Sequence, residues 1–379
     1  MNKFERAQTL LQNFSMDGWL IACNEDSDVH SRFMLGVESH ARHYIYIDAK
    51  GNHHIIATEM EAPMIKKSLD QKGIEAEVNS YAKAELIPEI LAPLISEKKI
   101  ALNYGEDLFG PDSTVYADYI TLGEYFTLKD LVPKSNFVSA APIINELRSV
   151  KSSENLKDLR NVCQATLEIL ESLPDWVKVG MTEKEVKAKL EYEYMKQGEI
   201  AFGTIVASNE NAADPHHNTS EKKIEPGVLL IDSGMKIDEM CSDITWTYWV
   251  QGEPTEKFLN AYNALYESKK EANKSYVDGA LNNQPAKSCR EKLSEYGYDH
   301  EKLFYHGLGH ALGFQPHDVG ARVSWKVSDD YKLRENMVYT NEPGLYWQGE
   351  FGIRLEDDLI VGKEKCEQVT YNPKDPLVI

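Results

Sequence analysis

The sequence predicts an α+β protein in which a smaller mixed α/β domain precedes a larger domain, and three observations support this prediction. The chain has 379 residues, more than one ordinary hydrophobic core requires. Its residues are 42% hydrophobic and 27% charged, as in soluble globular proteins. Strand-like and helical runs alternate along the chain. We therefore expect one domain over residues 1–142 and a second over residues 143–379.

The charge and the cysteine content argue against several classes of protein. Asp and Glu number 61 against 41 Lys and Arg, a net charge of −20, whereas nucleic acids and anionic membranes are bound by basic surfaces. The five cysteines are scattered without a CxxC motif, which argues against a disulfide framework or a structural zinc site. No apolar run has the length of a signal peptide or a membrane span. We expect a cytoplasmic protein with no nucleic-acid or membrane partner.

The first domain is predicted from several strands and a clear helix. The runs GWLIAC (residues 18–23) and HYIYIDAKGNHHIIAT (residues 43–58) are typical of strands, and the second contains a hairpin turn. Residues 59–73 predict a helix that ends at Gly73. A further strand is predicted within residues 98–107. No obvious cluster of catalytic residue types falls in this domain.

The passage between the domains is predicted over residues 130–155, and three helices are expected in the second domain. Ser153 is expected to cap the first of them, which carries one apolar stripe. Thr182 and Glu185 form a capping box at the start of the second. Residues 255–279 predict a third helix, which is long and amphipathic.

Acidic residues interrupt two strand–turn–strand units of the second domain. In the run LLIDSGMKIDEMCSDITW, Asp232 ends an apolar strand and Asp243 precedes a β-prone run. In the run NMVYTNEPGLYWQGEFGIRLEDDLIV, Glu342 follows one strand and Glu356 lies in the returning strand. A buried carboxylate is costly unless it is paired or binds a cation. Four acids in two similar hairpins therefore predict a shared metal site.

Histidines and glycines alternate between the two hairpins, in the run FYHGLGHALGFQPHD. His306 and His310 are four residues apart, but the glutamate of HExxH is missing and glycines weaken a helix there, which disfavours a zincin site. The glycine spacing also departs from GxGxxG. We expect the glycines to allow a close backbone approach that directs imidazoles into a crowded site. His317 ends the same run, and the pair His216 and His217 precedes the first hairpin.

One imidazole with four carboxylates is an oxygen-rich donor set for a divalent metal ion. It suits Mn²⁺, Co²⁺, Fe²⁺ or Zn²⁺ better than a metal that prefers thiolates. Five ligands exceed the need of one ion and suit two ions about 3.5–4 Å apart. We expect two divalent ions, with Mn²⁺ or Co²⁺ favoured over Zn²⁺ or Fe²⁺.

The ordered motifs resemble those of a known family. IDSG, CSDIT, HGLGHALG, NEPGLY and GIRLED, preceded by VASNENAADPHH, resemble the pita-bread metallopeptidases, and within them the Xaa-Pro group of prolidase and aminopeptidase P. The motifs extend from about residue 145 to residue 361, and the two-domain layout extends the resemblance to the whole chain. The resemblance implies a pita-bread (creatinase/aminopeptidase-like) second domain after a creatinase-like first domain.

The resemblance also implies a role for each matching residue. It implies that Asp243 and Glu356 bridge two metal ions. The complete set of metal ligands that it implies is Asp232, Asp243, His310, Glu342 and Glu356. His216 matches a histidine near the scissile carbonyl. His217 remains an alternative, because one residue is missing from the family register before the first of these ligands.

Further residues match the substrate side of the family's site. His317 matches a second substrate-facing histidine, and with His216 and Glu342 it completes the expected catalytic group. His306 and Arg354 match substrate-binding residues, and for the arginine an orienting role beside the bridging glutamate is the alternative.

Two positions need separate mention. Trp246 stands where the family often has an arginine, so the ion pair of that arginine is in question here. Arg322 is a further candidate for contact with the substrate.

The activity that the resemblance implies is hydrolysis of the Xaa-Pro bond at a free N-terminus, preferably in Xaa-Pro dipeptides, by a hydroxide that bridges two metal ions. A homodimer is expected. Aminopeptidase P, which acts on longer Xaa-Pro peptides, is the alternative. A creatinase-like hydrolase and a non-catalytic peptide-binding protein are less favoured, because both typically lack the five ligands that this chain retains.

Overall fold

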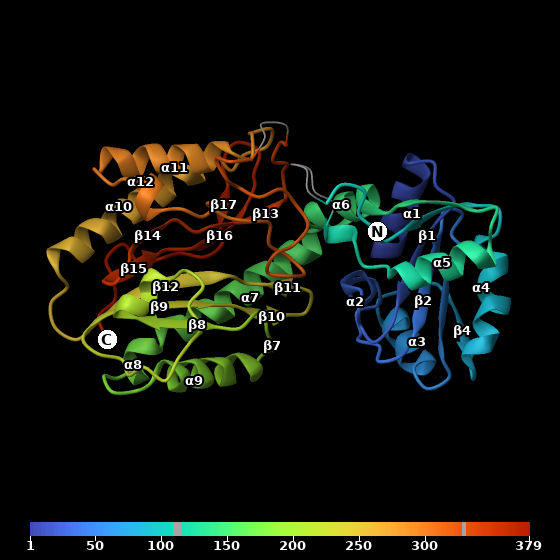
Figure 1. Cartoon of the computed structure of the whole chain (residues 1–379), viewed down its shortest axis with the longest axis horizontal. Coiled ribbons are helices and arrows are strands. Elements are labelled where there is room, and N and C mark those ends of the chain that lie inside the picture. The colour runs from blue at the N-terminus through green and yellow to red at the C-terminus, as the bar shows by residue number, and fades with distance from the viewer. Residues whose placement is uncertain (109–114, 328–330) are drawn as a thin grey trace. The chain divides into compact units, whose positions relative to one another are not determined.

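The computed structural model describes residues 1–108, 115–327 and 331–379 (Figure 1). The chain forms two compact units, Met1–Leu147 and Arg148–Ile379. The division expected after residue 142 falls near the start of helix α6 (Ala141–Ser149), which contains the end of the first unit.

The first unit is built on a six-stranded mixed sheet with strand order β4-β3-β2-β1-β5-β6. Neighbours among β1, β2 and β3 are antiparallel, whereas β4, β5 and β6 join the sheet in parallel. The strands are β1 (Gly18–Cys23), β2 (His43–Asp48), β3 (His54–Thr58), β4 (Glu77–Tyr81), β5 (Lys99–Leu102) and β6 (Asn136–Ser139). The helices are α1 (Lys3–Asn13), α2 (Val29–Leu35), α3 (Ala62–Gln71), α4 (Ile87–Ile95) and α5 (Leu122–Leu131), with short 3-10 turns at Ala84–Leu86 and Val115–Ala117.

The predicted strands and helix of the first unit are confirmed, with shorter bounds. The hairpin between β2 and β3 turns at Gly51, whose φ of 94° suits glycine. Helix α3 ends two residues before Gly73, which has a φ of 63°. The passage predicted over residues 130–155 is more regular than expected, because it contains β6 and α6.

Three helices of the second unit, α7, α9 and α10, begin at side-chain caps, and caps were predicted for the first two of these. Ser152, rather than Ser153, caps α7, since its side chain accepts a hydrogen bond from the backbone of Asn155. The capping box of Thr182 and Glu185 at the start of α9 is confirmed. The helices are α7 (Ser153–Glu171), α8 (Leu173–Trp176), α9 (Glu183–Met195), α10 (Glu256–Asn273), α11 (Gln284–Glu295) and α12 (His300–Leu303).

The two predicted strand–turn–strand units are confirmed as two antiparallel pairs, β9 with β12 and β13 with β16. Each pair encloses a shorter hairpin, β10 with β11 in the first and β14 with β15 in the second. The strands are β7 (Glu199–Ile200), β8 (Ile205–Ser208), β9 (Gly227–Ser233), β10 (Met235–Ile237), β11 (Met240–Cys241), β12 (Ile244–Val250), β13 (Val338–Asn341), β14 (Gly344–Trp347), β15 (Phe351–Arg354), β16 (Asp357–Ile360) and β17 (Glu367–Gln368).

Both faces of the β9–β12 pair are buried, so these strands are nearly continuous apolar runs. Leu229 and Ile231 belong to a hydrophobic cluster with residues of α7 and α9. Val228 and Leu230 belong to another cluster with residues of α10 and α11. Figure 1 shows the two helix pairs on opposite sides of the strands. The strand pair beside Asp232 and Asp243 therefore lies between two layers of helices.

Two expectations about the whole chain can be compared with the structure. Within the described residues, no helix combines the length and apolar character needed to cross a membrane. All five cysteines are free thiols, in agreement with the absence of a predicted disulfide framework.

Candidate metal centre and active site

The four acids predicted as ligands lie where the two long strand pairs end. Asp232 in β9 is directly opposite Thr245 of β12, and Asp243 immediately precedes β12. Glu342 follows β13 and Glu356 precedes β16. The backbone N–H of Glu356 donates to the carbonyl of Thr245 at 3.1 Å, which joins the two strand pairs beside the acids.

The segment that carries His310 runs alongside β13. The backbone N–H of Thr340 donates to the carbonyl of His310 at 3.0 Å, and that of Glu342 donates to the carbonyl of Leu308 at 2.8 Å. A Cβ at Gly309 would stand 2.2 Å from the carbonyl oxygen of Thr340, so only glycine permits this approach. The close backbone approach expected from the glycine-rich run is confirmed at Gly309.

Three of the five predicted ligands form a compact cluster. Asp243, His310 and Glu356 each offer one ligand atom, and these atoms lie within 4.8 Å of one another. Nε2 of His310 is 3.6 Å from Oδ2 of Asp243 and 3.6 Å from Oε1 of Glu342. These separations exceed hydrogen-bond distance, as expected for ligands that surround a shared cation.

The hydrogen bond of His310 prepares its ring for metal binding. Nδ1 donates to the carbonyl of Ala311 at 3.2 Å, which leaves the lone pair of Nε2 directed at the acids. Burial and the neighbouring His317 lower the pKa of His310 to about 3, so the ring is neutral at physiological pH. A neutral imidazole is the form that binds metal ions.

The acids repel one another in a buried setting. Burial and neighbouring carboxylates raise the pKa of Asp243 and of Glu356 well above the ordinary range, and burial raises the pKa of Glu342 to about 8. Oδ1 of Asp232 is buried without a hydrogen-bond partner among the described residues. A divalent cation would relieve both the repulsion and the unpaired oxygen, so these residues fit the metal that the donor set predicts.

Arg354 orients two of the acids. Its Nη2 is 2.5 Å from Oδ2 of Asp232, and its Nε donates to Oγ1 of Thr245 at 3.0 Å. Thr245 in turn donates to Oε2 of Glu356 at 2.6 Å. The guanidinium also donates to Oη of Tyr346, and its side chain is only 3% exposed. These contacts correspond to the orienting role that the sequence left open for this arginine.

Trp246 lies on the other face of β12. Since successive side chains of a strand alternate, Thr245 points to the acids and Trp246 points to the core between α7 and α9. The indole Nε1 donates to the carbonyl of Tyr371 at 2.9 Å. The tryptophan that replaces the family's arginine is therefore a core residue here.

The four candidate histidines outside the ligand set occupy different environments. The ring of His317 is 4.1 Å from that of His310, centroid to centroid, and burial and Arg322 lower its pKa. Nδ1 of His306 donates to the carbonyl of Gly307 at 2.8 Å, and its Nε2 accepts from Tyr346 at 2.9 Å.

The structure also separates the neighbours His216 and His217. His217 is half-buried, and its Nε2 donates to Glu183 at 2.9 Å. His216 is exposed and interacts electrostatically with both His306 and His317. His216 therefore stays the predicted catalytic histidine, while His217 is engaged by Glu183.

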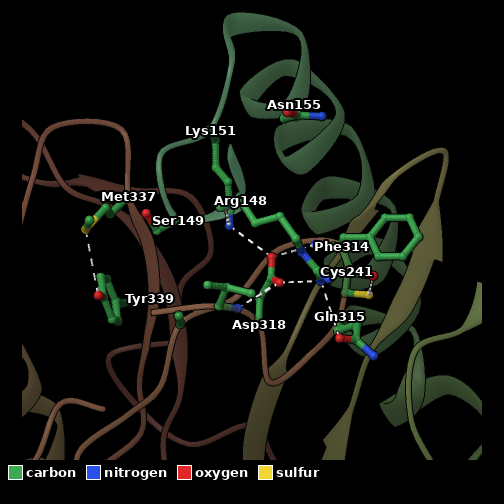
Figure 2. Close-up of polar contacts among 12 residues, drawn as sticks. Arg148, Ser149, Lys151, Asn155, Cys241, Phe314, Gln315, Asp318, Met337 and Tyr339 are labelled. Carbon is green, nitrogen blue, oxygen red and sulfur yellow. Dashed lines mark hydrogen bonds and ion pairs between the residues drawn. The ribbon is translucent and has the colours of Figure 1, made fainter. Parts of the chain in front are cut away.

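The loop that carries His317 is held by a buried cluster that sequence reasoning missed. Figure 2 shows the carboxylate of Asp318 between Arg148, at 2.5 Å, and Lys151, at 3.0 Å. Asp318 also accepts the backbone N–H groups of Phe314 and Val319. Burial would raise the pKa of Asp318, but the two cations hold it well below its usual range. The position of Asp318 directly after His317 was the feature of the sequence that could have indicated this buried cluster.

Asp318→Asn is expected to destabilise the second unit by about 3 kcal/mol or more, because it leaves two buried cations without their anion. Urea denaturation measures this loss. Glu221→Gln serves as the control, since Glu221 pairs with Lys184 at an exposed site and its loss should barely change stability. Equal stability of the wild type and Asp318→Asn would show that the ion cluster contributes little.

Two further buried acids were missed, Asp357 and Asp358. Asp357 pairs with Lys269 at 2.6 Å. Oδ2 of Asp358 accepts from the backbone N–H of Asp243 at 3.1 Å and from Sγ of Cys163 at 3.2 Å. Asp358 therefore fixes the backbone of a predicted ligand. The sequence could have indicated this, because Glu356, Asp357 and Asp358 are three consecutive acids in an apolar run. Since side chains alternate between the two faces of a strand, not all three can reach solvent.

Comparison with known families identifies the class of protein that this fold and cluster belong to. A profile of metallopeptidase family M24 matches residues 157–363, more than half of the chain. The chain therefore belongs to metallopeptidase family M24, and it is a peptidase for which the family implies divalent metal ions.

Individual relatives agree with this assignment. The chain is 33% identical over 257 residues to the Xaa-Pro dipeptidase of Pyrococcus horikoshii, which covers 66% of this chain and 72% of the relative. It superposes on the crystal structure of X-Pro aminopeptidase from Thermotoga maritima with a TM-score of 0.85 and 27% identity, over 98% of this chain and 100% of the other. The prolidase from Pyrococcus furiosus gives a TM-score of 0.79 at 27% identity, over 97% and 99%. The expected pita-bread α+β fold is confirmed.

Proposed function

We propose that this protein is a metal-dependent peptidase that hydrolyses the Xaa-Pro bond at a free N-terminus, with a preference for Xaa-Pro dipeptides. The observation that carries the proposal is the convergence of Asp243, His310 and Glu356, whose ligand atoms lie within 4.8 Å of one another. The relative in Pyrococcus horikoshii that bears the name Xaa-Pro dipeptidase supports the substrate class. Asp232 and Glu342 would complete the ligand set, and together with Asp243, His310 and Glu356 they would hold two divalent ions.

The chemistry of the substrate suits such a site. A bond to proline has no N–H and a fixed ring, so peptidases that bind this N–H fail to cleave it. Two divalent ions, Mn²⁺ or Co²⁺ in this proposal, would lower the pKa of water and so supply a nucleophile at neutral pH. His216 and His317 donate hydrogen bonds to the carbonyl oxygen as negative charge develops there. Glu342 transfers a proton to the departing proline nitrogen.

Two further residues act on the substrate side. His306 contacts the bound peptide, and its neutral ring is fixed by Tyr346. Arg354 orients Asp232 directly and Glu356 through Thr245, which keeps both carboxylates in place when substrate binds. The proposal also includes a homodimer and a cytoplasmic location, which sedimentation and fractionation would test.

A second candidate function is that of aminopeptidase P, which acts on longer peptides. The TM-score of 0.85 with the X-Pro aminopeptidase from Thermotoga maritima favours it. The two candidates share the metal cluster and differ in what closes the site beyond the proline.

One preparation loaded with Mn²⁺ or Co²⁺ distinguishes the candidates. We expect kcat/KM for an Xaa-Pro dipeptide to be at least roughly tenfold higher than for the matching Xaa-Pro-Yaa tripeptide, a difference of about 1.4 kcal/mol. An Xaa-Ala dipeptide is the control for proline recognition. A higher value for the tripeptide would establish aminopeptidase P, and faster cleavage of Xaa-Ala would contradict both candidates.

A further inference from the structure

The loop that carries His216 has little regular structure of its own. It follows β8, forms a short 3-10 helix over Asn209–Ala213 and reaches β9 at Gly227. The polar backbone groups of such a loop need partners outside it. On the site side, the carbonyl of Pro215 accepts from Nη1 of Arg354 at 3.2 Å. On the opposite side of the loop, one carboxylate accepts hydrogen bonds from several of its residues.

That carboxylate belongs to Glu183, the first residue of α9. Its side chain is fully buried and accepts six hydrogen bonds from residues on both sides of His216. The donors are the backbone N–H and hydroxyl of Ser208, the amide of Asn211, the ring of His217, and the backbone N–H and hydroxyl of Ser220, at 2.7–3.0 Å.

Hydrogen bonds stabilise the ionised form of the Glu183 carboxylate. Burial alone would raise its pKa, but the hydrogen bonds from Ser220, Asn211, His217 and Ser208 outweigh burial and lower it. The start of α9 adds two backbone contacts, because Glu183 N donates to the carbonyl of Lys222 and Lys184 N donates to that of Ser220. The carboxylate therefore ties the loop to a helix of 13 residues.

The hydrogen bond from His217 to Glu183 fixes the residue next to His216. His217 is turned to Glu183, while the carbonyl of Pro215 is held by Arg354. His216 stands between these two fixed residues and interacts with His306 and His317.

We propose that Glu183 is a positioning residue that acts through His216: it clamps the loop at Ser208, Asn211, His217 and Ser220 and so holds the His216 imidazole beside the scissile carbonyl. This inference rests on the proposed function for the role of His216. The residue itself touches neither substrate nor metal ligands, and its effect is one of geometry.

The test is a double-mutant cycle with Glu183→Gln and His216→Ala. A glutamine keeps the shape but has only one accepting oxygen, so we expect kcat to fall about 10- to 100-fold with metal affinity unchanged. In the His216→Ala background, Glu183→Gln should lower kcat less than about twofold, because the group it positions is already gone. An equal factor in both backgrounds would overturn the proposal.

Glu185→Gln is the matched control. Glu185 lies in the same first turn of α9 and accepts from the backbone N–H of Thr182 on the exposed side. Its loss should weaken the helix cap without changing kcat. An equal loss of kcat in both variants would mean that the start of α9, and not the carboxylate of Glu183, matters.

Two measurements decide the matter if Glu183→Gln does not fold or if the wild type cleaves no Xaa-Pro bond. His217→Ala should lower kcat and His217→Gln, whose amide can still donate to Glu183, should recover part of it; equal values would contradict the proposal. A crystal structure of His217→Ala should show His216 displaced, which requires no activity, and an undisturbed His216 would overturn the proposal. Failure of the proposed function would appear separately, as the absence of Xaa-Pro hydrolysis by the wild type.

Discussion

Asp243→Asn is expected to abolish both metal binding and peptidase activity. Asp243 is one of the three residues of the compact ligand cluster, and its backbone N–H donates to Asp358. An amide keeps the shape of the side chain but removes a negative charge and one oxygen ligand, so it would hold divalent cations far more weakly. We expect kcat to fall roughly 10³-fold or more, at least about 4 kcal/mol of transition-state stabilisation. Metal content of the purified protein and release of free proline from an Xaa-Pro dipeptide measure the two effects.

The control for this substitution is Asp238→Asn. Asp238 is exposed in the turn between β10 and β11 with a φ of 55°, a conformation that asparagine also tolerates. This variant should bind metal and turn over like the wild type. Normal metal content together with full activity in Asp243→Asn would contradict the proposed metal centre.

His317→Ala is expected to lower kcat by about 10²–10³-fold while metal content stays at the wild-type level. The ring of His317 lies 4.1 Å from that of His310, centroid to centroid, at an interplanar angle of 59°, yet it is not among the residues assigned as ligands. Its loss removes a hydrogen-bond donor for the developing oxyanion without changing the donor set. Steady-state kinetics with an Xaa-Pro dipeptide and titration with Mn²⁺ separate the two properties.

His317→Gln is the companion variant, because its amide can still donate a hydrogen bond and should retain more activity than alanine does. Loss of metal in His317→Ala would make the histidine a ligand instead. An unchanged kcat would remove it from the catalytic group.

Much of the site could be predicted from the sequence, because the chemistry depends on residue types in a fixed order. Four acids inside apolar strands indicated a metal site, since buried carboxylates need a cation. The glycines around His310 indicated a close backbone approach, which Gly309 makes against Thr340. Capping boxes and hairpins were also readable, because they depend on residues only a few positions apart.

The supporting residues could not be predicted, because their partners are distant in the chain. Thr245 meets Glu356, and Asp318 meets Arg148 and Lys151, only after the strands have paired in one register. The pairing register of the strands cannot be predicted from a local sequence pattern. The buried role of Asp358 beneath the backbone of Asp243 was hidden for the same reason.

The amino-acid sequence by itself determined the family, the candidate metal ligands and the two hairpins that carry four of them. Only the tertiary structure separates the surroundings of His216 and His217, since adjacent residues have the same sequence context. One of the two donates to a buried carboxylate from α9 and the other interacts with the histidines of the site. Burial and hydrogen-bond partners arise from long-range packing, and packing is the property that a local sequence pattern does not contain.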